Sequence, residues 1–382
     1  MDLRFSDQDL ALRAEVREFI RVRLPADVHR KMVEGRALRK DEIVQWQRVL
    51  NKKGWATPGW PREHGGPGWG AVQRWIFLDE LHQAPAPEPL SFNVNMIGPV
   101  LYTFGSAAQK QRFLARVANL DDWWCQGFSE PGAGSDLASL KTSARRDGEH
   151  YVVNGQKTWQ GMGHHADWMF TLVRTDPQAK PQAGITMLLI DMRSPGVTVR
   201  PIITIDGRHE VNEVFLDNVR VPLDCRVGDE NRGWDITKFL LGNERTGIAR
   251  IGMSKHLVRR AKALAAPEDL RFRERAAAIE IGLKALEITQ MRLLDGLREQ
   301  GDKPDPRSSI LKVQGSELRQ AASELLLRAA GPLAAECADE FDDASAEATT
   351  LASQYFTLRA ATIYGGSTEV QKNILAKAVL GL

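Results

Sequence analysis

The sequence predicts an α+β protein of three parts, with a helical region at each end and an all-β region between them. Of the 382 residues, 43% are hydrophobic and 26% are charged, which is enough apolar material for two or three packed domains. Apolar residues recur every three to four positions in residues 1–121 and 229–382, as is typical of helices. Residues 122–228 consist instead of short β-rich runs. We therefore expect domains over 1–121, 122–228 and 229–382.

The N-terminal region opens with a helix signal at Ser6. Ser6 and Asp9 have the spacing of a capping pair in front of an apolar helical period. The glycine- and proline-rich segment 58–70 interrupts the helical pattern. Around it, the periodicity predicts helices over about 40–53, 70–82 and 106–117.

The middle region predicts an antiparallel sheet closed into a barrel or a sandwich. Short β-rich runs follow one another without intervening helices, separated by glycine, proline and asparagine. The pair Asn154-Gly155 predicts a tight turn, because both residues tolerate a positive φ. The predicted strands cover 123–129, 141–146, 150–153, 168–173, 185–190 and 197–202.

The C-terminal region predicts a bundle of long helices. The two adjacent glycines in Tyr364-Gly365-Gly366-Ser367 should break the helical pattern and let a ligand approach the backbone closely. The helices are expected over 236–263, 268–298, 310–330, 344–363 and 368–379.

Composition excludes several classes of protein. Lys and Arg number 51 against 49 Asp and Glu, a net charge of +2, so nucleic acid is not an expected partner. The 3 cysteines form no C-x-x-C pair, which argues against a disulfide scaffold and favours a cytoplasmic location. No secretory leader or apolar membrane span is expected. We expect no metal site, because the adjacent His164 and His165 would point to opposite faces of a strand.

Two segments in the middle region have the residue types of a ligand site. The loop 129–136 (SEPGAGSD) should expose backbone N–H groups beside hydroxyl and carboxylate groups, which suits an anionic or carbonyl-bearing ligand. It could equally be a tight β-loop stabilised by local caps. Trp159 could cover a flat cofactor ring or be an ordinary core residue.

Two segments in the C-terminal region are also candidates. Glu244 lies among apolar residues, and desolvation there would raise its pKa towards that of a useful proton acceptor. The alternative is a surface ion pair with Arg245. Residues 364–369 predict a turn that opens into a capped helix, whose N–H groups favour phosphate. A plain connection between two helices explains that segment equally well.

Taken in this order, segments 129–136, 154–159 and 364–371 resemble the acyl-CoA dehydrogenase family, with weaker support from the glycines of 61–68. Within the family, the chain resembles the bacterial large-subunit type, which is similar to pimeloyl-CoA and steroid-side-chain acyl-CoA dehydrogenases. The resemblance implies an N-terminal α-helical domain, a middle β-barrel or sandwich and a C-terminal four-helix bundle. It also implies one FAD, bound between the β domain and the bundle and partly by a neighbouring subunit.

By position, the resemblance also assigns site residues. It implies that the chain removes the α and β hydrogens of an acyl-CoA thioester, whose carbonyl a backbone N–H helps to hold. The substrate residues implied are Ser135, Arg245, Tyr364, Gly365 and Gly366, and those for the cofactor are Gln126, Phe128, Ser129, Gly134, Ser135, Trp159, Gly161, Ser367 and Glu369.

The sequence departs from the family pattern at the catalytic position. Many members carry the catalytic glutamate directly after the tyrosine of the last motif, but here Gly365 occupies that place. A minority place the base in the first bundle helix, and the matching residue is Glu244. The hydroxyl usually found two places after the tryptophan is replaced by Gly161.

Two more family segments are absent. The R-x-x-F-G segment is replaced by residues 271–282, and a glycine-rich loop by the acidic stretch 339–347. We therefore expect either a homo-oligomer or a heterotetramer with a small acyl-CoA dehydrogenase subunit, with an electron-transfer flavoprotein as electron acceptor. The alternatives are a catalytically silent subunit that completes a partner's FAD site, and a flavin acyl-CoA oxidase.

Overall fold

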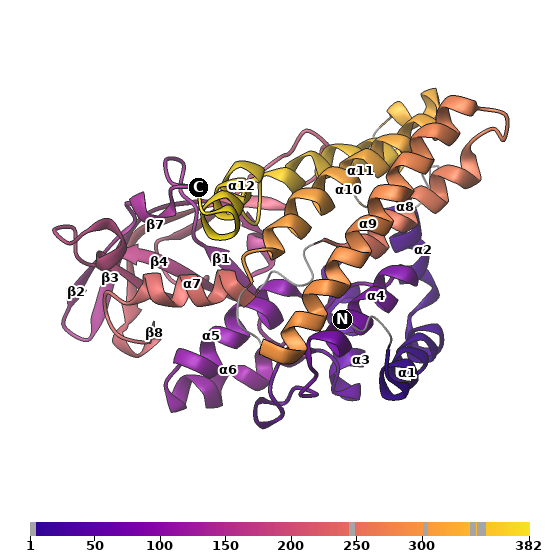
Figure 1. Cartoon of the computed structure of the whole chain (residues 1–382). Helices are drawn as coiled ribbons and strands as arrows, with labels where there is room; N and C mark the ends of the chain where they lie inside the picture. Colours follow the sequence, from indigo (N-terminus) through magenta and orange to yellow (C-terminus); the bar gives the residue numbers. More distant parts are fainter. Residues whose placement is uncertain (1–4, 244–248, 301–304, 337–340, 342–348) are drawn as a thin grey trace.

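The structure, a computed structural model, describes residues 5–243, 249–300, 305–336, 341 and 349–382. A sheet lies at one end of the molecule, the long C-terminal helices extend to the other, and the N-terminal helices lie beneath both in the view of Figure 1. The predicted fold class is confirmed. We keep the domain limits at residues 121 and 228 as a proposal, supported by the change from helix to strand after α6 and back at α7.

The N-terminal region is helical, as predicted. Its first helix has the expected cap: the Ser6 hydroxyl accepts the Asp9 N–H at 3.1 Å, and the Asp9 carboxylate accepts the Ser6 N–H at 3.1 Å. The short helices α2 and α5 and a π-helical turn over Phe92–Ile97 were not predicted. The helices are α1 (Asp7–Arg23), α2 (Ala26–Glu34), α3 (Lys40–Lys53), α4 (Ala71–Gln83), α5 (Gly98–Phe104) and α6 (Ala107–Asn119).

The middle region is one 8-stranded, mainly antiparallel sheet, in which β1 pairs with β4 in parallel. Along the sheet the strand order is β6-β7-β3-β2-β4-β5-β8, with β1 on the other side of β4. All six predicted strands are present, whereas the long β7 and the short β8 were not predicted. The bounds are β1 (Trp124–Gly127), β2 (Ser143–Asp147), β3 (His150–Gly161), β4 (Trp168–Arg174), β5 (Ile185–Asp191), β6 (Val197–Ile202), β7 (Val211–Pro222) and β8 (Arg226–Val227).

The tight turn predicted at Asn154-Gly155 is wrong. β3 runs straight through both residues, and its register against β7 shifts there by a bulge. Glycine is required for another reason: a Cβ at Gly155 would lie 2.4 Å from the Thr142 hydroxyl oxygen. The turn between β2 and β3 is at Gly148 instead, where φ is 57°.

The C-terminal region is a bundle in which α8, α9 and α10 pack on one another and α11 and α12 pack on α10. The single helix predicted over 236–263 is wrong, because Arg250 has a left-handed φ of 46° and caps a new helix. The helix predicted over 344–363 is described only from residue 349, and it becomes a 3₁₀ helix at Leu358–Thr362. The helices are α7 (Gly233–Asn243), α8 (Ile251–Leu264), α9 (Leu270–Gln300), α10 (Ser308–Ala330), α11 (Thr350–Thr357) and α12 (Thr368–Leu375).

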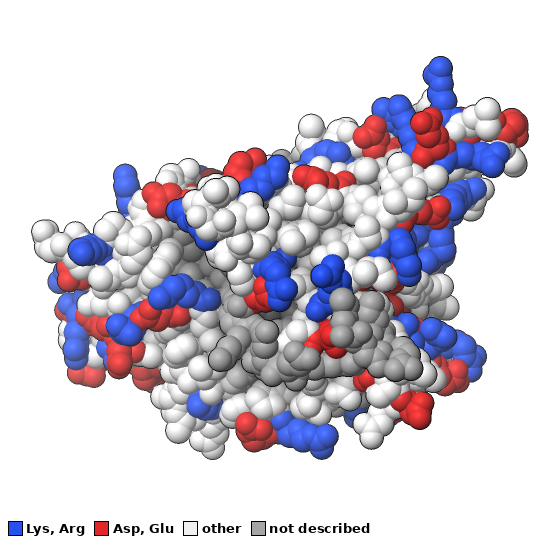
Figure 2. Space-filling view, in the orientation of Figure 1, with Lys and Arg blue, Asp and Glu red and all other residues white. Residues whose placement is uncertain are grey.

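The surface is mixed in charge. Figure 2 shows basic and acidic side chains interspersed over the face drawn, as the net charge of +2 predicts. Across the described residues, no helix has both the length and the apolar character needed to cross a membrane.

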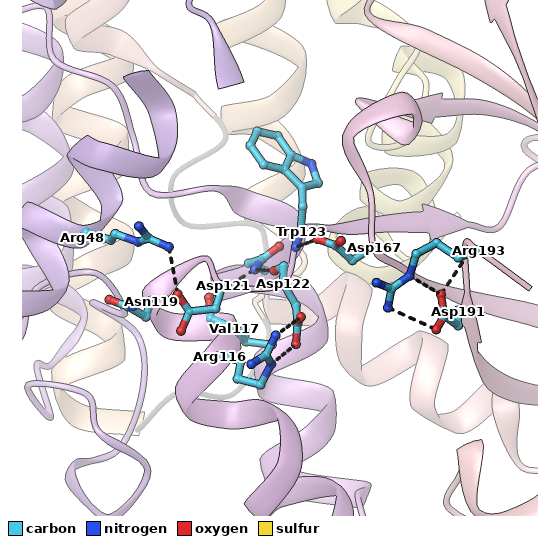
Figure 3. A network of polar contacts seen from close by, with 11 residues as sticks. Arg48, Arg116, Val117, Asn119, Asp121, Asp122, Trp123, Asp167, Asp191 and Arg193 are labelled. Carbon is cyan, nitrogen blue, oxygen red and sulfur yellow. Dashed lines mark hydrogen bonds and ion pairs between the residues drawn. The ribbon is translucent and has the colours of Figure 1, made fainter. Parts of the chain in front are cut away.

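A polar network joins the N-terminal helices to the sheet at the start of β1 (Figure 3). The buried Asn93 amide donates to the carbonyls of Val117 at 3.1 Å and Asp122 at 2.8 Å, and accepts the Trp124 N–H at 3.0 Å. The Arg116 guanidinium makes two 2.6 Å bonds to the Asp122 carboxylate. These bonds hold β1 in place, and β1 leads directly into the loop 129–136.

Candidate active site

The structure brings the predicted residues of the middle region together at one edge of the sheet. The Ser129 carbonyl accepts the Thr158 N–H at 2.9 Å, which places the loop 129–136 beside the end of β3. Glu130 and Ala133 exchange two backbone hydrogen bonds of 3.0 Å, so the chain reverses tightly there. Gly134 and Ser135 follow the reversal and are exposed. Backbone and hydroxyl groups therefore face solvent at this edge.

Gln126 and Phe128 differ in what they offer a ligand. Gln126 is half-buried in β1, whereas the Phe128 side chain is buried against Phe170, with ring centroids 5.8 Å apart. Only backbone groups of Phe128 are therefore suited to contact a cofactor.

Trp159 has two unusual properties. Its side chain is 61% exposed, and its φ of 66° is a rare left-handed value for a bulky residue. The register of β3 against β7 shifts between Thr158 and Gln160, so Trp159 is the bulged residue. Backbone strain of this kind is typical of functional sites. The core alternative for Trp159 is thus wrong, and the exposed indole suits a flat ring.

There is also a steric reason why position 161, two places after this tryptophan, is a glycine. A Cβ at Gly161 would lie 2.9 Å from the Phe92 ring, so any side chain there requires Phe92 to move. Packing against Phe92 therefore favours glycine at position 161, and this explains why the hydroxyl of the family pattern is absent here.

A buried ion pair, not predicted from sequence, lies under this edge. The Lys157 ammonium donates to Glu130 at 2.8 Å and to the Phe128 carbonyl at 3.2 Å. Burial outweighs the attraction of Glu130 and lowers the pKa of Lys157 to about 8. Burial alone would raise the pKa of Glu130, but Lys157 and N–H donors hold it below its ordinary value. The pair anchors the start of the loop 129–136 to β3.

The second group of predicted residues is the turn between the 3₁₀ helix and α12. Gly365 and Gly366 have φ values of 64° and 89°, which glycine adopts without strain. A Cβ at Gly366 would lie 2.3 Å from the Gln371 amide nitrogen. Ser367 caps α12 by accepting the Val370 N–H, as predicted, and the acidic Glu369 is exposed in the first turn. The Tyr364 side chain is 51% exposed.

Helix α10 holds this turn through a buried polar stripe. Its members recur at spacings of four, three and four residues and are at most 4% exposed. The Lys312 ammonium donates to the carbonyls of Ala361 at 2.6 Å and Tyr364 at 2.7 Å. The Arg319 guanidinium donates to the Tyr364 hydroxyl at 3.2 Å. The stripe consists of Lys312, Ser316, Arg319 and Ser323.

Glu244 and Arg245 lie outside the described residues, so their predicted roles are not tested. The described residues nearest in sequence are Asn243, which ends α7, and Ala249, which is buried against Gly315 of α10. A Cβ on Gly315 would lie 2.7 Å from the Ala249 Cα atom, so α10 and the chain entering α8 are in close contact. The metal prediction also stays open: in the described part of the chain, no group of His, Cys, Asp or Glu side chains is arranged to hold a metal ion.

Comparison with known proteins agrees with this architecture. Models of the N-terminal, middle and C-terminal domains of acyl-CoA dehydrogenase match residues 6–121, 125–219 and 231–380. The chain is 37% identical to acyl-CoA dehydrogenase IpdE1 of Mycobacterium tuberculosis over 351 residues, which cover 90% of this chain and 88% of the relative. Fold and family together define a flavin-dependent acyl-CoA dehydrogenase.

Two solved structures are similar over the whole chain. A steroid acyl-CoA dehydrogenase, Tcur3481-Tcur3483, superposes with a TM-score of 0.89 at 29% identity and covers 100% of this chain and 99% of that one. The ChsE4-ChsE5 complex from Mycobacterium tuberculosis superposes with a TM-score of 0.85 at 30% identity. The match covers 100% of this chain and 99% of that one. The chain belongs to the acyl-CoA dehydrogenase family, and its cofactor is FAD.

The residues at the sheet edge fit such a cofactor. A flat isoalloxazine ring would cover the exposed, strained indole of Trp159, and the loop 129–136 offers exposed backbone and the Ser135 hydroxyl beside it. Individual contacts of FAD with Gln126, Ser129 or Ser367 stay predictions.

Proposed function

We propose that this chain converts an acyl-CoA thioester to the trans-2-enoyl-CoA, with Glu244 as the catalytic base. The observation that carries the proposal is Gly365. It stands where many family members have their glutamate, and its exposed, left-handed backbone has no side chain to accept a proton. Glu244 is the matching acid of the alternative family pattern.

In this proposal each group of the chain has a separate task. Glu244 removes the α-proton of the thioester, and Arg245 orients the substrate or its CoA portion. The Gly365 N–H donates to the thioester carbonyl and stabilises the charge that develops on its oxygen. FAD, when bound, would supply the acceptor for the β-hydride, and Ser135, Trp159 and the sheet edge would hold it.

The first prediction concerns Glu244. In Glu244→Gln, substrate should no longer bleach the flavin, a loss of at least about a thousandfold in rate, because the amide cannot accept a proton. FAD content should stay unchanged. The measurement is anaerobic flavin absorbance after mixing with acyl-CoA, with Glu324→Gln on the exposed face of α10 as control. Bleaching at the normal rate in Glu244→Gln would remove Glu244 from the mechanism.

The proposal also includes a partner subunit that contributes to the FAD site. The missing R-x-x-F-G segment supports it, and so does the similarity to the ChsE4-ChsE5 complex, which is named for two different chains. The chain expressed alone should be compared with the chain expressed with a small-subunit homologue. A yellow protein that acyl-CoA bleaches supports a catalytic chain, whereas a colourless protein that becomes yellow only with its partner supports the silent role.

The electron acceptor distinguishes a dehydrogenase from an oxidase. We propose an electron-transfer flavoprotein, and its reduction by the substrate-reduced enzyme is the supporting result. Stoichiometric peroxide release in air would favour the oxidase instead. A cytoplasmic location is part of the same proposal.

A further inference from the structure

Helix α9 presents large apolar side chains to the outside of the bundle. Its inner face packs in the bundle core, where Ile279, Leu283 and Leu286 are buried. On its outer face, however, Ile281 and Leu270 are both 71% exposed. Single apolar residues on a surface are ordinary, but a continuous row of them on one helix face indicates an interaction surface.

Ile281 belongs to a straight row of residues along the helix. Exposed or partly exposed positions follow one another there at spacings of three or four residues, so they share one face of α9. With a rise of about 1.5 Å per residue, the row is about 27 Å long. Its inner members are apolar and its two ends are charged. The row, here named the α9 stripe, consists of Glu274, Ala278, Ile281, Ala285, Ile288 and Arg292.

The α9 stripe is complementary to itself when it is reversed. A second copy of the chain can lie antiparallel on α9, with a two-fold axis at the level of Leu283. Ile281 then faces Ala285 of the second copy. Ile288 faces Ala278 of the second copy in the same way. Because each large side chain meets a small one, the two helices can approach closely and interdigitate.

The two ends of the stripe follow the same symmetry. Glu274 of one copy faces Arg292 of the other, so opposite charges meet at both ends. One helical turn further out, the exposed Leu270 faces Gly296. The nearest described atom to a Cβ at Gly296 is an Arg307 guanidinium nitrogen, 3.9 Å away, so there is room for an incoming side chain. Size and charge therefore select the same register independently.

A parallel pairing of the same two faces is disfavoured. It would place Ile281 on Ile281 and Ala285 on Ala285, which crowds the contact at one level and leaves a gap at the other. It would also set Glu274 against Glu274 and Arg292 against Arg292, and like charges repel. A different partner chain would impose no relation between the two ends of the stripe. The mirrored order of size and charge therefore indicates a second copy of this chain.

We propose that two copies of this chain associate antiparallel through the α9 stripe, about a two-fold axis at Leu283. Such an isologous contact uses the same surface on both copies, as is usual in dimers of identical chains. The inference concerns assembly and does not depend on Glu244 as the catalytic base. A small subunit that completes the FAD site would occupy another surface, so the assembly would contain two copies of this chain with or without it.

The first test counts the copies of this chain in the FAD-loaded protein, with its small subunit if one copurifies. Sedimentation velocity should show at least two copies. Ile281→Glu should halve their number, because a charge buried in each contact should weaken association at least about a hundredfold. Val22→Glu, at an exposed aliphatic side chain of α1, is the matched control. A wild-type protein with one copy, or an Ile281→Glu protein with the wild-type number, overturns the inference.

Charge reversal tests the antiparallel register. At low ionic strength, Glu274→Arg and Arg292→Glu should each weaken association about tenfold, because each change sets like charges against one another at both ends of the contact. The double variant Glu274→Arg/Arg292→Glu restores opposite charges and should recover most of this loss. A double variant weaker than either single variant would overturn the register.

Cross-linking gives a second readout of the same register. Residues 281 and 285 should lie opposite each other across the axis, so oxidised Ile281→Cys/Ala285→Cys protein should run as a covalent dimer without reductant. Ile281→Cys alone should stay unlinked, because the two copies of residue 281 are offset by about one helical turn, about 6 Å along the axis. Efficient linking of the single variant would indicate a parallel contact, and an unlinked double variant would exclude the contact. Either result overturns the inference.

Discussion

At the scale of single residues, the Lys157–Glu130 pair shows how a buried charge can support a site without taking part in chemistry. Lys157 is 0% exposed and Glu130 is 8% exposed, and besides the ion pair Glu130 accepts the N–H groups of Lys141 and Thr142 at 2.6 and 2.9 Å. These bonds connect the loop 129–136 to the start of β2. Removing one charge therefore leaves the other buried without its partner.

The prediction at this scale is a large loss of stability in Lys157→Met. The free energy of unfolding should fall by about 3–5 kcal/mol, because Glu130 is left as an unpaired buried anion. Lys157→Met/Glu130→Gln should recover part of this loss. Chemical denaturation is the measurement, with Lys53→Met, which breaks the exposed pair with Glu15, as a control expected to cost below about 1 kcal/mol. Similar losses in Lys157→Met and the control would contradict the prediction.

At the scale of elements, α10 organises the candidate substrate side through its buried polar stripe. Most buried helix faces are apolar, but here Lys312 of the stripe donates to the backbone of the 3₁₀ helix and of the glycine turn. Because a 3₁₀ helix and two glycines supply little rigidity of their own, α10 determines where Gly365 lies.

We accordingly predict that Lys312→Met loosens the turn. The carbonyls of Ala361 and Tyr364 lose a charged donor, so the protein should lose about 1–3 kcal/mol of stability. Amide hydrogen exchange in residues 361–367 should become at least about tenfold faster, and KM for acyl-CoA should rise. Lys372→Met, on the exposed side of α12, is the control. Unchanged exchange in the turn would show that α12 and Ser367 suffice to hold it.

At the scale of the whole molecule, Asn93 connects the N-terminal helices to the sheet. Its single amide donates to the Val117 carbonyl in α6 and the Asp122 carbonyl before β1, and accepts the Trp124 N–H in β1, so it links α6, the π-helical turn and the sheet. The position of the loop 129–136 therefore depends on packing between two regions of different secondary structure.

The corresponding prediction is that Asn93→Leu affects both stability and cofactor binding. Three backbone groups lose their partner, which should cost about 3 kcal/mol, and displacement of β1 should lower the FAD retained after gel filtration. Asn95→Leu, two residues away and only partly buried, should cost less than about 1 kcal/mol. Denaturation together with flavin absorbance measures both effects. Normal FAD retention in a destabilised Asn93→Leu protein would show that the Asn93 contacts between the N-terminal helices and the sheet do not control cofactor binding.

Much of the fold was predictable because its signals are local. The helix predicted over 40–53 has the same bounds as α3. Its C-terminal end follows from Gly54, which has a left-handed φ of 79°. β7 was missed because Asp217-Asn218 resembles a turn, whereas Asn218 takes a φ of 52° within the strand. The break at Arg250 was missed because the apolar period continues through it.

The site was predictable only in part. The motifs located the exposed Trp159 and the glycine turn, both of which depend on nearby residues. The partners of Lys157 and Arg319 could not be predicted, because Glu130 and Tyr364 are 27 and 45 positions away in the sequence. Polar residues at helical spacing on α10 were the one available signal, and an amphipathic helix with a solvated face gives the same pattern.

The sequence by itself determined the order of helix and strand, the family and the position of each motif, because periodicity and turn chemistry act over a few residues. Only the tertiary structure decided which charges share a buried environment: Lys157 with Glu130, and Arg319 with Arg250 and Glu88. Desolvation depends on every element that packs around a group, and those elements come from all parts of the chain.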